Sequence, residues 1–171
     1  LGRSRRDSHG NTFSPKQVTD HIKKAVTIEA LLRLHMKYET DMNNIHVTAC
    51  WTTLARLAWP RFADQRRLWK KGALENLAEQ RWLRKKGALE HLVRNTVRAA
   101  MAGELDARNV ANVAYGAARS GRGKSLVGLF AALARAAEPR LGAFNAQELA
   151  NTAWAFAKAG QLDEALFAAL A

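Results

Sequence analysis

The sequence predicts an all-α fold, namely an α-solenoid of stacked helix–turn–helix repeats that carries a basic helical insertion. Alanine and leucine dominate the 171 residues, only 3 are proline, and 48% are hydrophobic, so the composition favours helices and supplies a core. Apolar residues recur at helical spacing between capping and stop signals. An internal period in the second half indicates repeats that bury their apolar faces against one another.

Residues 1–24 are predicted to form a basic N-terminal arm, whose first residues are rich in arginine and serine. This composition is typical either of the stretch beside a removed organelle-targeting segment or of a mobile basic arm. Residues 25–58 are expected to form a degenerate repeat, with a first helix over about 27–37 and a second over 44–58.

A basic insertion over residues 59–87 follows the degenerate repeat. Residues 68–77 match residues 83–92, and this offset of 15 residues is close to four helical turns. Between positions 61 and 98 the chain holds 11 basic and 4 acidic side chains, with Trp69 and Trp82 among them. We therefore expect a helical, strongly positive segment here.

The clearest repeat lies in the second half. Residues 105–121 match residues 144–160, which lie 39 positions later, and most pairs are identical or chemically similar. Each of these segments is expected to be the second helix of a pair, with first helices over about 88–100 and 124–137. The pairs define two repeats and a partial third one, over residues 88–122, 123–160 and 161–171.

Both second helices carry their own start and stop signals. Asp106 and Asn145 are expected to be N-cap residues, because their side chains can accept hydrogen bonds from the free N–H groups of a first helical turn. The glycines at positions 121 and 160 suit the left-handed residue that follows a helix.

The net charge is +12, from 27 lysines and arginines against 15 acidic residues. Residues 1–100 hold 20 basic and 9 acidic side chains, whereas residues 101–171 hold 7 and 6. Such an imbalance suits a polyanionic partner such as nucleic acid. No apolar run approaches the length of a membrane span, so no membrane-spanning segment is expected.

Residues 144–160 resemble the most recognisable segment of the octotricopeptide repeat proteins of algal and related organelles. Residues 43–51, followed by 54–57, look like a degenerate repeat of the same kind. The resemblance implies a stack of helix pairs that binds single-stranded RNA, either mRNA or rRNA, in an organellar matrix or stroma (mitochondrion or chloroplast). It implies a role in RNA processing, stability or translation, or as a subunit, beside other proteins, of a ribonucleoprotein such as a ribosome.

One polar stripe on each second helix is a candidate base-reading surface, because its side chains vary within a fixed frame. The alternative is an ordinary solvated face. Gly116 also falls on the first stripe, and Tyr115 and Trp154 border the stripes, where they either stack on bases or pack between repeats. Asn112 and Asn151 are the same in both copies, which favours a structural task for them. The candidate base readers are Arg108, Asn109, Asn112, Gln147, Glu148 and Asn151.

A second set of side chains is expected to bind RNA phosphates and to give affinity that does not depend on sequence and falls with salt. Most of them lie in or near the basic insertion, and the others lie on the repeats or in the turn between them. The predicted phosphate ligands are Arg66, Arg67, Lys70, Lys71, Arg81, Arg84, Lys85, Lys86, Arg94, Arg98, Arg119, Arg122, Lys124 and Lys158.

Other chemistry finds little support. Residues 118–125 resemble a phosphate-binding loop, but they join two predicted helices and no strand precedes them. The single cysteine, Cys50, is expected in the core, and the 5 histidines show no metal-ligand or catalytic spacing. We therefore expect neither enzymatic activity nor a cofactor or metal.

The alternative to the RNA-binding hypothesis is a helical scaffold subunit of a protein complex that makes no direct contact with RNA.

Overall fold

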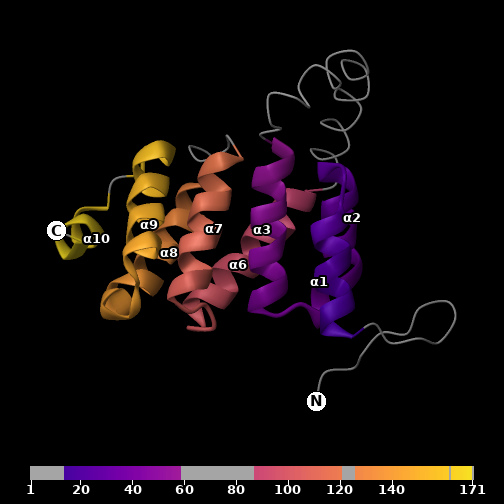
Figure 1. Cartoon of the computed structure of the whole chain (residues 1–171), viewed down its shortest axis with the longest axis horizontal. Helices are drawn as coiled ribbons and strands as arrows, with labels where there is room; N and C mark the ends of the chain where they lie inside the picture. Colours follow the sequence, from indigo (N-terminus) through magenta and orange to yellow (C-terminus); the bar gives the residue numbers. More distant parts are fainter. Residues whose placement is uncertain (1–13, 59–86, 121–125, 162, 171) are drawn as a thin grey trace, which may run out of the picture.

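The computed structural model describes residues 14–58, 87–120, 126–161 and 163–170. All regular secondary structure in these ranges is helical, and no strand occurs among them, which confirms the all-α prediction for this part of the chain (Figure 1). Residues 1–13 of the predicted arm and residues 59–86 of the basic insertion lie outside the described ranges. The helices are α1 (Pro15–Lys24), α2 (Ile28–Tyr38), α3 (Asn44–Ala58), α6 (Ala88–Met101), α7 (Ala107–Arg119), α8 (Val127–Ala137), α9 (Ala146–Ala159) and α10 (Glu164–Leu170), with 3-10 turns at Glu39–Asp41 and Glu138–Ala143.

The last part of the segment expected to form an arm, Pro15–Lys24, is helix α1. Ser14 and Gln17 build a capping box at its start, and Pro15 occupies the first turn, where its missing N–H costs nothing. Val18 and Ile22 lie one turn apart and are buried, and the helix packs against α3. The sequence pattern did not reveal this short amphipathic helix, because only two large apolar side chains mark its buried face and the segment is highly charged.

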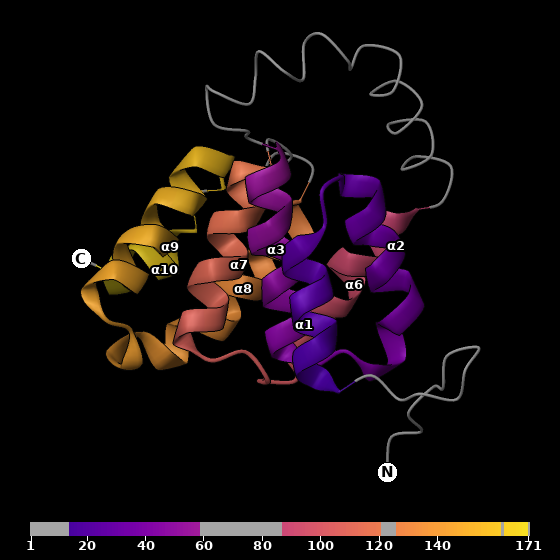
Figure 2. The same ribbon diagram turned by 45° about the vertical axis from the view of Figure 1, so that its right-hand side comes forward.

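The helices form two rows. Helices α1, α3, α7 and α9 pack side by side in chain order, and α2, α6 and α8 form a second row against them (Figures 1 and 2). One hydrophobic core lies between neighbouring helices and between the rows, and its largest side chains include Trp51, Phe130 and Phe156. The two phenylalanine rings, from α8 and α9, meet edge to face with centroids 5.0 Å apart.

The helix starts are regularly spaced along the second half of the chain. Helices α7 and α9 begin at Ala107 and Ala146, and α6 and α8 begin at Ala88 and Val127, so the same interval separates both pairs of starts. This regularity places equivalent side chains of α7 and α9 at the same height on neighbouring helices.

The predicted caps of α7 and α9 are confirmed. The Asp106 carboxylate accepts the backbone N–H of Asn109 at 2.7 Å, and Asn145 accepts that of Glu148 at 2.9 Å. Asn43 accepts the N–H of His46 at 3.2 Å in the same way at the start of α3. Gly160 has the left-handed conformation expected after α9, with φ of 67°. Gly121 lies outside the described residues.

Helices α3 and α7 lie in close contact at Gly116. A Cβ atom at this glycine would lie 2.6 Å from the backbone oxygen of Trp51. Gly116 is therefore buried and does not belong to the exposed stripe on which the sequence pattern placed it. Trp51 is fully buried, and its indole N–H donates to the Thr96 hydroxyl on α6 at 2.9 Å, so this point links three helices.

Cys50 is fully buried beside this contact, as expected, and burial raises the pKa of its thiol to about 12.

Within the described ranges, no helix combines the length and the apolar character that a membrane crossing requires.

Candidate nucleic-acid interface

Two parallel stripes of side chains lie on the neighbouring helices α7 and α9. On α7 the stripe contains residues 108, 112, 115 and 119, and on α9 it contains residues 147, 151, 154 and 158. Both follow the spacing i, i+4, i+7 and i+11, which places the four side chains of each set on one face of a helix. Because the helices pack together and begin at equivalent points of the two matching segments, the equivalent side chains meet across the seam.

The first half of this seam is an open polar groove. Its lining includes Arg108 and Asn112 from α7 and Gln147 and Asn151 from α9, and the cavity has a volume of about 410 Å³. Glu148 and the N-cap residue Asn145 complete the lining. Five of the six predicted base readers therefore meet at one place, although they come from two separate helices.

Some polar groups of the groove are bonded within α9. The Gln147 side-chain amide donates to the Asn151 oxygen at 3.0 Å, and the Glu148 carboxylate accepts the backbone N–H of Asn145 at 3.0 Å. In contrast, Arg108 and Asn112 make no side-chain hydrogen bond to any residue of the described ranges, and Arg108 is exposed. The guanidinium and this amide are thus the groups most available to a ligand.

Asn109 is the predicted base reader that the structure does not bring to the groove. Its side chain is only 9% exposed, and its amide oxygen accepts the Thr48 hydroxyl of α3 at 3.1 Å. The next residue along a helix is turned by about 100°. One step from Arg108 is therefore enough to point the Asn109 side chain at the neighbouring helix.

Asn112 and Asn151 occupy equivalent positions but differ in their contacts. Asn151 accepts the Gln147 amide, whereas position 108, four residues before Asn112, is an arginine that makes no such bond. The identity of the two asparagines led us to expect one shared structural task. Within the described ranges, the hydrogen bonds show that task for Asn151 alone.

The second half of the seam is aromatic and cationic. The rings of Tyr115 and Trp154 lie with centroids 5.1 Å apart and tilted by 39°. The Arg119 guanidinium lies over the Tyr115 ring, with 5.5 Å between the guanidinium carbon and the ring centroid, and donates to the Tyr115 hydroxyl at 2.8 Å. Lys158 follows Trp154 by one turn and is exposed. The two aromatic residues therefore pack between helices, yet Trp154 remains 43% exposed.

The remaining predicted phosphate ligands are distributed elsewhere. Arg94 and Arg98 are exposed on α6, which belongs to the second row of helices. The others fall outside the described residues, namely Arg66, Arg67, Lys70, Lys71, Arg81, Arg84, Lys85, Lys86, Arg122 and Lys124.

Sequence reasoning did not assign a site role to Arg56 on α3. This arginine lies 13 positions after its N-cap residue Asn43, as Arg119 and Lys158 lie 13 positions after theirs. Its guanidinium donates to the backbone oxygens of Lys23 at 3.1 Å and of Ala25 at 2.7 Å. A cation thus recurs at the same height on three neighbouring helices, and the common distance from the caps is the signal that reveals it.

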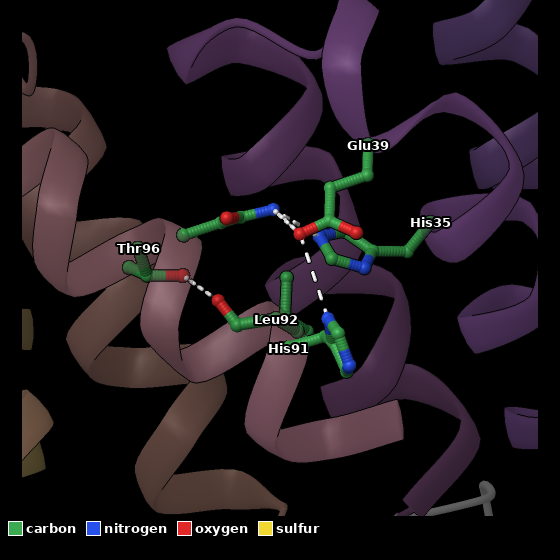
Figure 3. A network of polar contacts seen from close by, with 6 residues as sticks. His35, Glu39, His91, Leu92 and Thr96 are labelled. Carbon is green, nitrogen blue, oxygen red and sulfur yellow. Dashed lines mark hydrogen bonds and ion pairs between the residues drawn. The ribbon is translucent and has the colours of Figure 1, made fainter. Parts of the chain in front are cut away.

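A cluster of polar side chains joins α2 to α6 on the other row (Figure 3). The Asn95 amide nitrogen lies 3.3 Å from Nε2 of His35 and donates to the Glu39 carboxylate at 3.2 Å. Nδ1 of His91 lies 3.5 Å from the same carboxylate. Sequence spacing did not indicate this cluster, because its two histidines lie far apart in the chain and on different helices.

Burial dominates the electrostatics of this cluster. It lowers the pKa of His35 to about 4, an effect that Glu39 opposes and His91 reinforces, so that His35 is neutral at pH 7. Burial alone would raise the pKa of Glu39, but the hydrogen bond from the Asn95 amide and the nearby histidines, His91 and His35, hold it below its ordinary value. Over the described ranges, no group of three or more His, Cys, Asp or Glu side chains is arranged to hold a metal ion. The cluster therefore acts as a polar link between helices.

No protein-family model, curated protein or solved structure matches this chain. Any functional proposal therefore rests on the chain's own sequence pattern and on the chemistry of its residues. On the described face, that chemistry is an open polar groove continued by exposed aromatic and cationic side chains.

Proposed function

We propose that this chain is an RNA-binding helical-repeat protein that holds single-stranded RNA along the seam between α7 and α9. One observation carries the proposal: side chains from two equivalent helices, chosen as base readers from the sequence pattern, line one open polar groove. Single-stranded RNA exposes the edges of its bases, which such groups recognise through hydrogen bonds.

The architecture we propose is an α-solenoid with the repeat period found in the sequence. The two rows of helices support it, because each row contains every second one of the described helices from α1 to α9. The equal spacing of helix starts and the common caps support it as well. In a solenoid of this kind, equivalent helices present equivalent positions along one face, which suits recognition of an extended ligand.

The groove offers donors and acceptors for base edges. Arg108 presents planar N–H donors without an acceptor, whereas Gln147 at the equivalent position presents both a donor and an acceptor. This difference within one frame allows the two helices to prefer different bases. The acidic Glu148 in the same groove disfavours a phosphate there and leaves it to bases.

Phosphate binding is assigned to the basic side chains named above as predicted phosphate ligands. The charge of +12 supplies long-range attraction for an anionic strand. Arg119 and Lys158 lie at the end of the same seam, and the segment between α3 and α6 holds most of the other predicted phosphate ligands. Affinity from these contacts falls as salt concentration rises.

The resemblance to octotricopeptide repeat proteins supports an organellar setting for this activity. We propose action in the matrix or stroma of a mitochondrion or chloroplast, on mRNA or rRNA, either as a transcript factor or within a ribonucleoprotein such as a ribosome. Binding without catalysis is the activity that the described groups support best.

The first prediction tests the groove. Replacement of Arg108, Asn112 and Gln147 by alanine is expected to weaken binding of single-stranded RNA at least about tenfold, since hydrogen bonds from a charged donor contribute about 1.5–3 kcal/mol. Fluorescence anisotropy with labelled RNA pools measures this change. Arg135→Ala on α8 is the matched control, because Arg135 is an exposed arginine that is neither a predicted base reader nor a predicted phosphate ligand. If the parent binds no RNA even at low salt, the scaffold hypothesis replaces this proposal.

A further inference from the structure

The Tyr115–Trp154 pair lies one helical turn beyond the polar groove. We infer that Trp154, supported from behind by Tyr115, is a stacking platform for one unpaired base, and that Arg119 and Lys158 hold the adjoining phosphates. This inference rests on the proposed RNA binding and specifies its ligand as an unpaired strand. A base within a duplex stacks on its neighbours and offers no free face to a side chain.

The first argument is the exposure of Trp154. A tryptophan that serves packing alone is highly buried on average, although its size makes complete burial rare. Here 43% of the residue stays exposed, although Tyr115 fixes the ring at a centroid distance of 5.1 Å. A ring that is held in place but uncovered loses little conformational entropy when a base stacks on it.

The second argument is the charge around the ring. Helix α7 contains no acidic residue, and helix α9 contains only Glu148, which is tied into the capping box of its first turn. Arg119 and Lys158 each follow an aromatic residue by four positions, so both cations lie on the same face as the rings. The Arg119 guanidinium uses one nitrogen on the Tyr115 hydroxyl, which orients the group and leaves other N–H donors for a phosphate.

The third argument is the order of groups along the seam. On both helices an asparagine precedes the aromatic residue by three positions and a cation follows it by four. The stretch from Asn151 to Lys158 rises about 10 Å along the helix. A nucleotide that lies along the seam therefore meets an amide at its base edge, a ring at its base face and a cation at its phosphate.

The experiment compares three replacements of Trp154. Trp154→Phe retains an aromatic face, Trp154→Leu retains an apolar contact for Tyr115 without such a face, and Trp154→Ala removes both. The probes are a fluorescein-labelled single-stranded RNA of mixed sequence and the same RNA annealed to its complement. We expect the leucine and alanine variants to bind the single strand about fivefold to a hundredfold more weakly, and the phenylalanine variant to stay close to the parent. Thermal unfolding of each variant checks that α9 remains folded.

A charge test accompanies the ring test. Lys158→Ala is expected to weaken binding and to lower the slope of log affinity against log salt by about 0.7, the value for one phosphate contact on a single strand. The matched control is again Arg135→Ala, which is expected to leave the slope unchanged.

The possible outcomes separate this inference from the proposed function. If the leucine variant binds RNA as tightly as the parent while the groove variant loses affinity, RNA binding stands and the platform is wrong. Equal loss of single-strand and duplex affinity in the leucine variant also overturns the platform, as does a change of oligomeric state without a change in RNA affinity. If the parent binds neither probe at low salt, the proposed function itself fails.

Discussion

His35 is the side chain whose burial has the clearest measurable consequence. The unfolded chain gives this histidine its ordinary pKa of 6.5, whereas the folded chain lowers the pKa to about 4, mainly through burial. Between these two pH values the unfolded chain binds more protons than the folded one. The stability that depends on neutral His35 is therefore fully present above pH 6.5 and is lost as the pH falls toward 4.

The corresponding prediction concerns urea unfolding. The free energy of unfolding is expected to fall by about 2–3 kcal/mol between pH 7 and pH 4.5 on account of His35. Glu39 contributes little in this window, because its pKa lies below 4.5 and its own contribution is lost only at lower pH. His35→Gln is expected to flatten the profile, and His21→Gln on the exposed face of α1 is the control. An unchanged slope in His35→Gln would contradict the assignment.

At the residue scale, helical periodicity predicted much of the candidate site. Arg108, Asn112, Gln147 and Asn151 reach one groove because the two matching segments hold them at equivalent heights. Asn109 does not line this groove, and periodicity alone could not show that, since it does not say which neighbouring helix covers the flank of a stripe. That information resides in α3, whose Thr48 hydroxyl binds the Asn109 amide.

At the element scale, Gly116 tests how closely α3 and α7 must pack. Gly116→Ala would place a Cβ atom 2.6 Å from the Trp51 backbone oxygen, and backbone cannot move aside as a side-chain end does. We expect a loss of about 1–3 kcal/mol, as for other overpacked sites, measured by chemical or thermal unfolding.

Gly128 on α8 is the matched control for this change. A Cβ atom there would meet nothing within 4 Å, so Gly128→Ala is expected to stabilise the protein by about 0.5–1 kcal/mol through helix propensity. If the two variants change the free energy of unfolding by the same amount, the close approach of α3 and α7 does not exclude a side chain at position 116.

Local signals explain which helices could be predicted. Helices α7 and α9 carry a strong cap, an apolar residue before it and regular spacing, so their starts were found from sequence. Helix α1 was missed because only Val18 and Ile22 mark its buried face. The cluster of His35, Glu39, His91 and Asn95 was missed for another reason: it depends on the packing of α2 on α6, and no spacing within one helix records such a contact.

At the scale of the whole molecule, charge and recognition are divided between regions. The polar groove lies in the part of the chain where basic and acidic residues nearly balance, whereas residues 1–100 carry most of the net charge of +12. If both regions serve RNA binding, they contribute different kinds of affinity. Phosphate contacts act on every sequence alike, and base contacts distinguish sequences.

This division leads to a prediction with two separable readouts. Reversing Lys70, Lys71, Lys85 and Lys86 to glutamate is expected to weaken binding of all RNA sequences by a similar factor. It should also lower the slope of log affinity against log salt by about 3, if each lysine makes one phosphate contact on a single strand. Replacing Arg108, Asn112 and Gln147 is expected to change the relative preference among sequences and to lower the slope by less than about 1, since only Arg108 carries a charge. Competition binding against a random RNA pool at several salt concentrations measures both quantities. If the charge reversal altered sequence preference as strongly as the groove variant does, phosphate binding and base recognition would not be separate. The same segment would then perform both.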